Sequence, residues 1–492
     1  MALTGGFRPG RKRGDRIRGL RLVLVSGLVG TSAIAGAATS GAIPDPLATA
    51  KLTASAPQQS MQAGDAAVPC SPDGAGTSPL SLADVVSRAL CSNPQTRAAW
   101  ANALVQAAQV GVAQSAYLPS ISATAGLQQV RSSSASGATS GARNVTEGTG
   151  GLGLGYVLYD FGARDSALQV ALQTVASANY AQDATLQKVI LSAVQAYYQL
   201  FGTRAAVSAM EEAERAAQES VKAATARYDA GTATPADKLL AQTAYSQAML
   251  NRIQAQGAAT SAEGILANVM GADADRPFQY RAPDIRAPDQ AFEGDLRSLI
   301  ALARERRPDL AAAQAQVDAA AAGVRAARAA GMPTISVSAN INYNDTSIAP
   351  AFNTQAVGIL VNIPLFSGFA TTYRVRAAQA QLGSQMALRD SVNSQVALDV
   401  WQSYYSLRTG TQAVRSAADL VASAEASERL VLGRYKAGVG TILDTLTAQS
   451  SLASARLQNI QAQYSWYVLR ATLAQALGQL DSATAASPDR QP

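Results

Sequence analysis

The chain carries one pentapeptide pattern twice, RYDAG at residues 227–231 and RYKAG at residues 434–438. The offset between them is 207 positions (434 − 227). Nearer the N-terminus the offset is larger: Pro94 and Pro308 lie 214 positions apart (308 − 94), because the first copy has a longer Ser- and Gly-rich stretch over 131–141, which we expect to be a loop. Such a period indicates duplication of a unit of about two hundred residues, far longer than a solenoid repeat.

Each copy is predicted to contain a helix, two strands, a long helix, a tight turn and a further helix. We expect the long helices over about 165–229 and 372–436, and each would be on the order of 100 Å long at 1.5 Å per residue. Because this exceeds any compact domain, they must pack lengthwise against other helices. The shorter helices expected over 81–116 and 235–270 would together cover one long helix, and their many small residues permit close helix contacts.

The segment ISVSANINY (335–343) alternates apolar and polar residues, and its length suits a transmembrane β-strand. The next apolar segment continues the alternation. We therefore expect these side chains to face lipid: Ile335, Val337, Ile341, Ile359 and Val361. Four strands in one chain cannot close a barrel that hides its edges from lipid, so the barrel must be shared among chains. A soluble amphipathic sheet is the alternative.

The sequence contains no histidine, which excludes Ser-His and Cys-His catalysis and His-bearing zinc sites. We expect no enzyme activity, no metal site and no cofactor.

The net charge of +6 is confined to the N-terminus, where residues 1–37 hold seven Arg and Lys residues and one Asp before and within an apolar stretch. This pattern predicts a secretory signal peptide cleaved near Ala37. The nearly neutral remainder does not favour nucleic acid as a partner.

These observations divide the chain into five parts: a signal peptide (1–37), a polar N-terminal segment (38–80), a first repeat (81–290), a second repeat (291–480) and a polar C-terminal tail (481–492). Cys70 and Cys91 lie in a chain predicted to be exported. Export favours a structural disulfide that joins the polar segment to the first helix. Free or redox-active thiols are the alternative, although the C-x-x-C spacing is absent.

Two aspartates lie just after the glycine that follows each long helix. Asp237 follows Thr234 by three residues, and Asp444 follows Thr441 in the same way. Both pairs fit a helix start, with Thr at the N-cap and a carboxylate in the first turn. This capping role alone would explain both residues. The functional alternative places them at the tip of a symmetric tube, as rings of like charge around a pore.

As a set, the sequence features resemble the TolC family of trimeric outer-membrane channel-tunnels. The motifs that carry the resemblance are LSL at 80–82 with Asn93-Pro94, LYDFG at 158–162, PLFSG at 364–368 and the two Arg-Tyr-x-Ala-Gly turns. The resemblance implies a mainly α fold with a β-barrel part. A homotrimer would form a twelve-stranded outer-membrane β-barrel on a long periplasmic α-helical tunnel. It also implies recruitment by an inner-membrane transporter with its periplasmic adaptor.

Within this family, the absence of a cysteine near the predicted cleavage site looks more like the type I protein-secretion branch than the lipoprotein drug-efflux branch. The opening PLSLADVV (79–86) with the two cysteines is similar to the subunit that exports adenylate cyclase-haemolysin toxins. We therefore expect a passive exit duct for a protein substrate, with an ABC transporter as partner. The alternatives are drug efflux with a proton-driven pump and, in another class, a periplasmic coiled-coil scaffold that never enters lipid.

The resemblance also implies a gate at the periplasmic entrance. In the family, two aspartate rings lie one helical turn apart there, and a tyrosine and an arginine hold the entrance closed. Asp444 matches the first ring, Tyr435 the tyrosine and Asp237 the partner of that tyrosine. Thr447 stands in place of the second aspartate, and Gly440 stands in place of the arginine. The gate is therefore expected to carry half the charge and one link fewer.

Overall fold

The computed structural model describes residues 44–53, 79–133, 142–285 and 295–481. Contacts divide the chain into two units, Met1–Pro46 and Leu47–Pro492, and the following description concerns the second unit. The signal peptide expected over 1–37 and Cys70 lie outside the described residues. The cleavage site and the disulfide between Cys70 and Cys91 therefore stay predictions.

The described part of the second unit has the same order of elements twice, two helices, two strands, a long helix and a further helix, preceded by the short 3-10 helix η1. The elements are η1 (Thr49–Leu52), α1 (Leu82–Ser92), α2 (Pro94–Ser115), β1 (Ser120–Ser133), β2 (Ala142–Tyr159), α3 (Ala163–Asp229), α4 (Pro235–Val269), α5 (Leu296–Arg306), α6 (Pro308–Ala329), β3 (Thr334–Thr346), β4 (Ala349–Asn362), α7 (Ala370–Lys436) and α8 (Ile442–Ala476). The structure thus confirms the duplication. No described helix combines the length and hydropathy that a membrane span requires.

The two long helices, α3 and α7, contain 67 residues each. They end where the sequence predicted and begin two residues earlier. The prediction of a single helix over 81–116 is wrong, because α1 and α2 are separate helices. Asn93 between them has extended backbone (φ −62°, ψ 129°), which a following proline favours. Its side-chain oxygen then accepts a hydrogen bond from Gln95 N at 2.8 Å and so caps α2.

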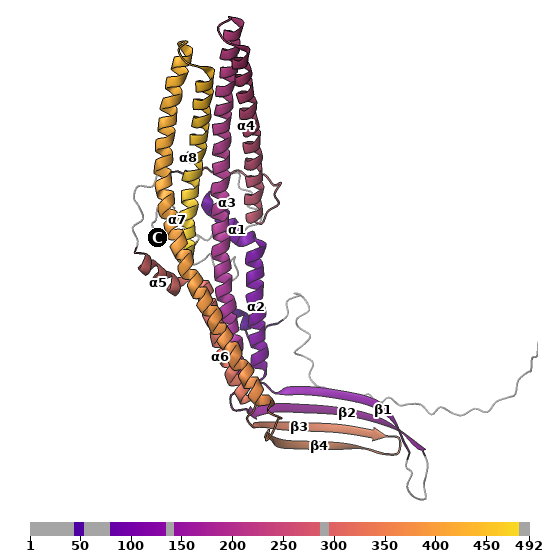
Figure 1. The fold of residues 1–492 in the computed structure, drawn as a ribbon. Coiled ribbons are helices and arrows are strands. Elements are labelled where there is room, and N and C mark those ends of the chain that lie inside the picture. The colour runs from indigo at the N-terminus through magenta and orange to yellow at the C-terminus, as the bar shows by residue number, and fades with distance from the viewer. Residues whose placement is uncertain (1–43, 54–78, 134–141, 286–294, 482–492) are drawn as a thin grey trace, which may run out of the picture. The chain divides into compact units, whose positions relative to one another are not determined.

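The shorter helices cover the long ones in succession, as expected. Helix α3 packs against α2, α4, α6 and α8, and α7 packs against α5, α6 and α8. Figure 1 shows α3 with α4, and α7 with α8, as two hairpins whose turns lie at the end of the helices opposite the sheet. We call this end the tip.

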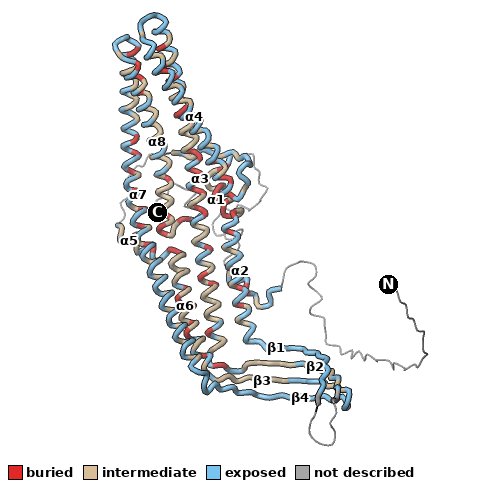
Figure 2. Tube along the Cα trace, turned by 45° about the vertical axis from the view of Figure 1, so that its right-hand side comes forward, coloured by how far each residue is buried: buried red, intermediate tan, exposed pale blue. Residues whose placement is uncertain are grey.

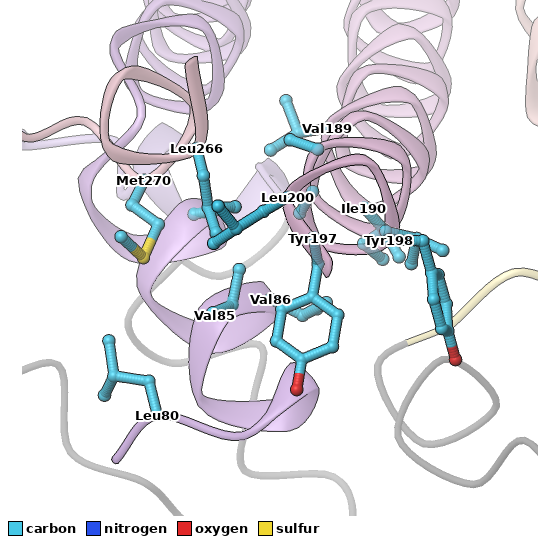
Figure 3. Packing of buried hydrophobic residues seen from close by; sticks show 14 of the residues in the cluster. Leu80, Val85, Val86, Val189, Ile190, Tyr197, Tyr198, Leu200, Leu266 and Met270 are labelled. Carbon is cyan, nitrogen blue, oxygen red and sulfur yellow. The ribbon is translucent and has the colours of Figure 1, made fainter. Parts of the chain in front are cut away.

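The most extensive hydrophobic cluster lies where α1 packs against α3 and α4 (Figure 3). Val85 and Val86 of α1 contribute to it with Tyr197 and Leu200 of α3 and Leu266 of α4, all at most 2% exposed. Burial of an apolar side chain of this size stabilises a fold by roughly 1.5–3 kcal/mol. A second cluster joins α5, α7 and α8 in the other copy. These clusters fix the two hairpins at their bases, whereas a smaller hydrophobic cluster joins them at the tip.

Each corner between the sheet and a long helix uses two successive residues with positive φ. Phe161 (52°) and Gly162 (87°) precede α3, and Gly368 (60°) and Phe369 (65°) precede α7. This backbone is natural for glycine but costs other residues roughly 1–2 kcal/mol. Both positions of each corner have positive φ, and Gly and Phe occupy them in opposite order in the two copies. The LYDFG and PLFSG motifs are therefore the corners that join the sheet to the long helices.

The four strands form one antiparallel sheet in the order β1-β2-β3-β4. Strand β1 continues to Ser133, into the segment over 131–141 that we expected to be a loop, because its pairing with β2 continues to Ala142. Most of the sheet is exposed in Figure 2, and every residue of β4 is exposed. Strands β1 and β4 are the two edges.

Candidate functional site

At the tip, α4 and α8 each begin with a reciprocal capping box. Asp237 Oδ2 accepts hydrogen bonds from Thr234 N at 2.9 Å and Thr234 Oγ1 at 2.8 Å. Asp444 Oδ2 accepts from Thr441 N at 3.3 Å and Thr441 Oγ1 at 2.7 Å. In return, each threonine oxygen accepts from the backbone N–H of its aspartate. The capping role that the sequence allowed is therefore present in both copies.

These hydrogen bonds favour the ionised carboxylates. The pKa of Asp237 is lowered by the backbone and then the side-chain hydrogen bond from Thr234. The pKa of Asp444 is lowered by the side-chain and then the backbone hydrogen bond from Thr441, and the charge of Arg434 adds to the effect. Both groups are therefore anionic at neutral pH, and both lie at the tip.

Three of the predicted site residues border one groove of about 430 Å³ between α7 and α8: Gly440, Asp444 and Thr447. Arg434 lines the same groove. The Thr447 hydroxyl donates to the Leu443 carbonyl within α8 at 2.8 Å. A Cβ at Gly440 would lie 3.0 Å from Tyr435 N, so a larger residue there would force the turn to shift.

Tyr435 points away from this groove, into the contact between the hairpins. It is 6% exposed and packs with Ala224 of α3, Ala241 of α4 and Ile442 of α8. Ala241 lies one helical turn beyond Asp237, so Tyr435 and Asp237 occupy the same end of two packed hairpins. The Asp237 carboxylate accepts hydrogen bonds from Thr234. The link from Tyr435 to Asp237 therefore stays a prediction.

Arg227 is the tip residue that sequence reasoning missed. Its Cζ lies 4.1 Å from the centroid of the Tyr435 ring, and Nη2 donates to the Tyr435 carbonyl and, at 3.5 Å, to the Lys436 carbonyl. The repeated Arg-Tyr doublet was a signal, but it marked only the duplication. It did not show that the arginine of one copy meets the tyrosine of the other.

At the opposite end, strand register places the five predicted apolar residues on one face of the sheet. Val337 pairs with Ile359 and Ile335 with Val361, while Ile341 pairs with Gln355 and, on β2, with Leu152. Ile359 is 71% exposed and Ile341 52%. Ile335 and Val337 are partly exposed. Since side chains alternate between faces, the five residues form one apolar surface, which we call the apolar face.

The other face of the sheet carries mainly small polar residues and glycine, with Leu360 opposite Ser336 as an apolar exception. Ser338 pairs with Gly155 and Asn340 with Gly153. A Cβ on Gly153 would lie 3.2 Å from Asn340 Oδ1 and 3.3 Å from Ser122 Oγ, so neighbouring polar side chains occupy the space above the glycine. The two faces therefore differ in chemistry.

The sequence matches the outer membrane efflux protein family over residues 85–272 and 299–479, which includes most of both copies. The chain belongs to this family, which includes TolC. Among relatives of the efflux protein family, protein CyaE of Bordetella pertussis is 33% identical over 80% of this chain and 82% of its own. Outer membrane efflux protein BepC of Brucella suis is 27% identical, over 81% of this chain and 85% of its own.

Solved structures of efflux proteins share the fold. The Campylobacter jejuni CmeC outer membrane channel aligns with a TM-score of 0.73 and 18% identity, over 82% of this chain and 88% of its own. TolC-family channels form trimers and work with adaptors and inner-membrane transporters. The relatives are channels and not enzymes. The repeat boundaries at 81–290 and 291–480 stay our proposal.

Proposed function

We propose that this efflux protein is the outer-membrane exit duct of a type I secretion system for a protein substrate. The observation that carries its place in the membrane is the exposed apolar face opposite a small polar face. Alternation of apolar side chains toward lipid and polar side chains toward an aqueous lumen is the pattern of transmembrane β-barrels. Lipid would cover the apolar face and water the other.

A homotrimer completes the proposed barrel. Strands β1 and β4 each have one neighbour in the sheet, and an open edge is not tolerated in lipid. Pairing of β4 of one copy with β1 of the next would close three sheets into a twelve-stranded barrel. The helices support the same assembly, because α4 and α7 lie at opposite margins of the helical layer and expose apolar side chains, including Leu239, Leu250, Trp401 and Leu430.

The tip is the proposed periplasmic entrance. In a trimer, Asp444 would form one ring of three carboxylates, and Thr447 would leave the next turn uncharged. Tyr435 with Asp237 would help hold the entrance closed, because both lie at the ends of packed hairpins. The duct is passive and opens when an inner-membrane ABC transporter and a periplasmic adaptor recruit it.

Two features favour a protein substrate. Similarity to CyaE favours type I secretion. The predicted signal peptide has no adjacent cysteine for lipidation, which the drug-efflux branch would carry. Efflux of small molecules with a proton-driven pump is the second candidate, and the similarity to efflux protein BepC favours it.

Deletion of the gene for this protein tests which cargo it exports. We expect secretion of a polypeptide into the medium to stop while the intracellular level of an efflux dye stays unchanged. Dye accumulation with normal protein secretion would favour the second candidate. Heat-modifiable trimers in the outer-membrane fraction would support the location, whereas recovery only from the soluble periplasm would favour a coiled-coil scaffold.

A further inference from the structure

The guanidinium of Arg227 connects the two hairpins at the tip. Arg227 lies in the last turn of α3, and it stacks on the ring of Tyr435 in the last turn of α7. It also donates to the carbonyls of Tyr435 and Lys436, which end α7. A cation at a helix C-terminus and a cation over an aromatic ring are both favourable, so one side chain makes two kinds of attraction to the neighbouring hairpin.

We propose that Arg227 is a latch that holds hairpin α7–α8 against hairpin α3–α4 and thereby keeps the tip closed. This inference rests on the proposed function of the tip as a gate. Arg227 is a positioning residue in this scheme, because it acts by fixing Tyr435 and the end of α7. Separation of the hairpins would break both of its contacts at once.

The position of Arg227 suits a latch. Two other polar links between the hairpins lie farther from the turns: Ser220 Oγ donates to Gln449 Oε1 at 3.1 Å, and Arg456 Nη1 lies 2.5 Å from Glu212 Oε2. Below the latch, the hairpins are thus joined independently. Loss of the Arg227 contacts would release the last turns while these lower links persist.

The internal repeat shows that the placement of Arg227 is specific. Its counterpart Arg434 is exposed and borders the groove with Asp444, whereas Arg227 is half-buried between hairpins. Conversely, Tyr435 is buried, and its counterpart Tyr228 is 40% exposed. Lys238 Nζ lies 5.3 Å from the Tyr228 ring, but these two residues belong to the same hairpin and cannot connect it to the other.

The alternative is that Arg227 only caps the end of α7. Ala241 distinguishes the two roles, because it is 0% exposed and lies between the hairpins beside Tyr435. Separation of the hairpins would uncover Ala241, whereas fraying of the last turn of α7 would leave it covered by α3 and α8. An Ala241→Cys reporter therefore measures separation directly.

The experiment uses the full-length trimer with Ala241→Cys and measures the rate of maleimide labelling, with the parent protein as the background for the native cysteines. In this reporter protein we expect Arg227→Met to speed labelling by roughly ten-fold, which corresponds to about 1.4 kcal/mol. The matched control is Lys238→Met, which also removes a cation from a tyrosine ring at the tip and should leave the rate unchanged. Arg227→Lys should give an intermediate rate, since it keeps the charge and loses the planar fork.

An unchanged rate in Arg227→Met, or an equal increase in Lys238→Met, would overturn the latch. Ala224→Cys, also 0% exposed in the same cluster, replaces the reporter if trimers with Ala241→Cys do not form. Single-channel conductance separates the latch from the gate on which it rests. Faster labelling with higher conductance supports both, whereas faster labelling with unchanged conductance keeps the latch and contradicts the gate.

Discussion

At the scale of single residues, Asp444 combines a local role with a place beside a groove. Its carboxylate accepts a hydrogen bond from Thr441 and so caps the start of α8. Its exposed charge lies in the same groove as Arg434, Gly440 and Thr447. The first role needs only a hydrogen-bond acceptor, and the second needs a negative charge. Substitution by asparagine separates the two, because an amide oxygen still accepts hydrogen bonds but is neutral.

Asp444→Asn should therefore weaken cation selectivity and block by divalent cations without lowering trimer yield. Three copies of the substitution remove three negative charges from one ring. Reversal potentials in planar bilayers under a salt gradient measure the selectivity. If selectivity and block stay unchanged, Asp444 is only a helix cap.

The same carboxylates predict how the tip responds to acid. The folded-state pKa values of Asp237 and Asp444 are lowered, so each ionised carboxylate stabilises the folded start of its helix. This stabilisation is fully present above the unfolded pKa, about 3.9, and is lost as the pH falls through the lower folded values. We expect amide exchange in the turns over 230–234 and 437–441, corrected for its intrinsic pH dependence, to become faster below about pH 4. Asp237→Asn with Asp444→Asn should remove this acid transition, and its persistence in the double variant would assign it to other groups.

The capping boxes were predictable from the sequence because Thr and Asp lie three residues apart in one turn. The contact between Arg227 and Tyr435 joins residues 208 positions apart, and no local pattern reveals which doublet turns inward. The burial of Tyr435 depends on small residues, Ala224 and Ala241, that the opposite hairpin supplies.

At the scale of elements, the sheet places its chemistry by register. Val337 and Ser338 are neighbours in β3 and lie on opposite faces, the first opposite Ile359 and the second opposite Gly358. A shift of one residue would exchange every side chain between the faces. This pair therefore offers a matched test of the apolar face.

Val337→Arg should reduce trimer assembly, because a charge on the lipid face costs roughly 2–4 kcal/mol near the bilayer midplane. Ser338→Arg should leave assembly nearly unchanged and alter conductance instead. Trimer yield from outer-membrane fractions and single-channel recording measure the two effects. Identical behaviour of the two variants would show that the assigned faces are wrong.

Long helices were more predictable than short elements. Helices α3 and α7 end as expected, because a glycine follows shortly after the last residue of each. The break at Asn93 was not predicted, although the proline that follows disfavours helical backbone at this residue. The extent of β1 was missed because hydrogen bonding to β2 extends a strand through Ser-rich sequence that has little strand preference of its own.

At the scale of the whole molecule, the repeated halves give the tip two hairpins with different roles. Tyr435 of one half packs against Ala224 and Ala241 of the other. In the proposed trimer the link from Tyr435 to Asp237 would be present three times. A hydrogen bond to a charged acceptor contributes about 1.5–3 kcal/mol, so three would bias a two-state tip strongly toward closure.

Tyr435→Phe combined with Asp237→Ala should accordingly raise single-channel conductance in planar bilayers. Thr234→Ala removes the hydroxyl that caps α4 but keeps the Asp237 carboxylate, and it serves as the control together with trimer yield. Unchanged conductance in the double variant would contradict the link, because the hairpins would then be held closed by other contacts.

The central claim is that three copies share their sheets to form one outer-membrane duct. Single-particle electron microscopy of the full chain in lipid nanodiscs tests it most directly. We expect a threefold particle in which β4 of each copy pairs with β1 of the next and the apolar face of Val337 and Ile359 meets lipid. A monomer, or a trimer joined only through its helices with β1 and β4 unpaired, would contradict the account.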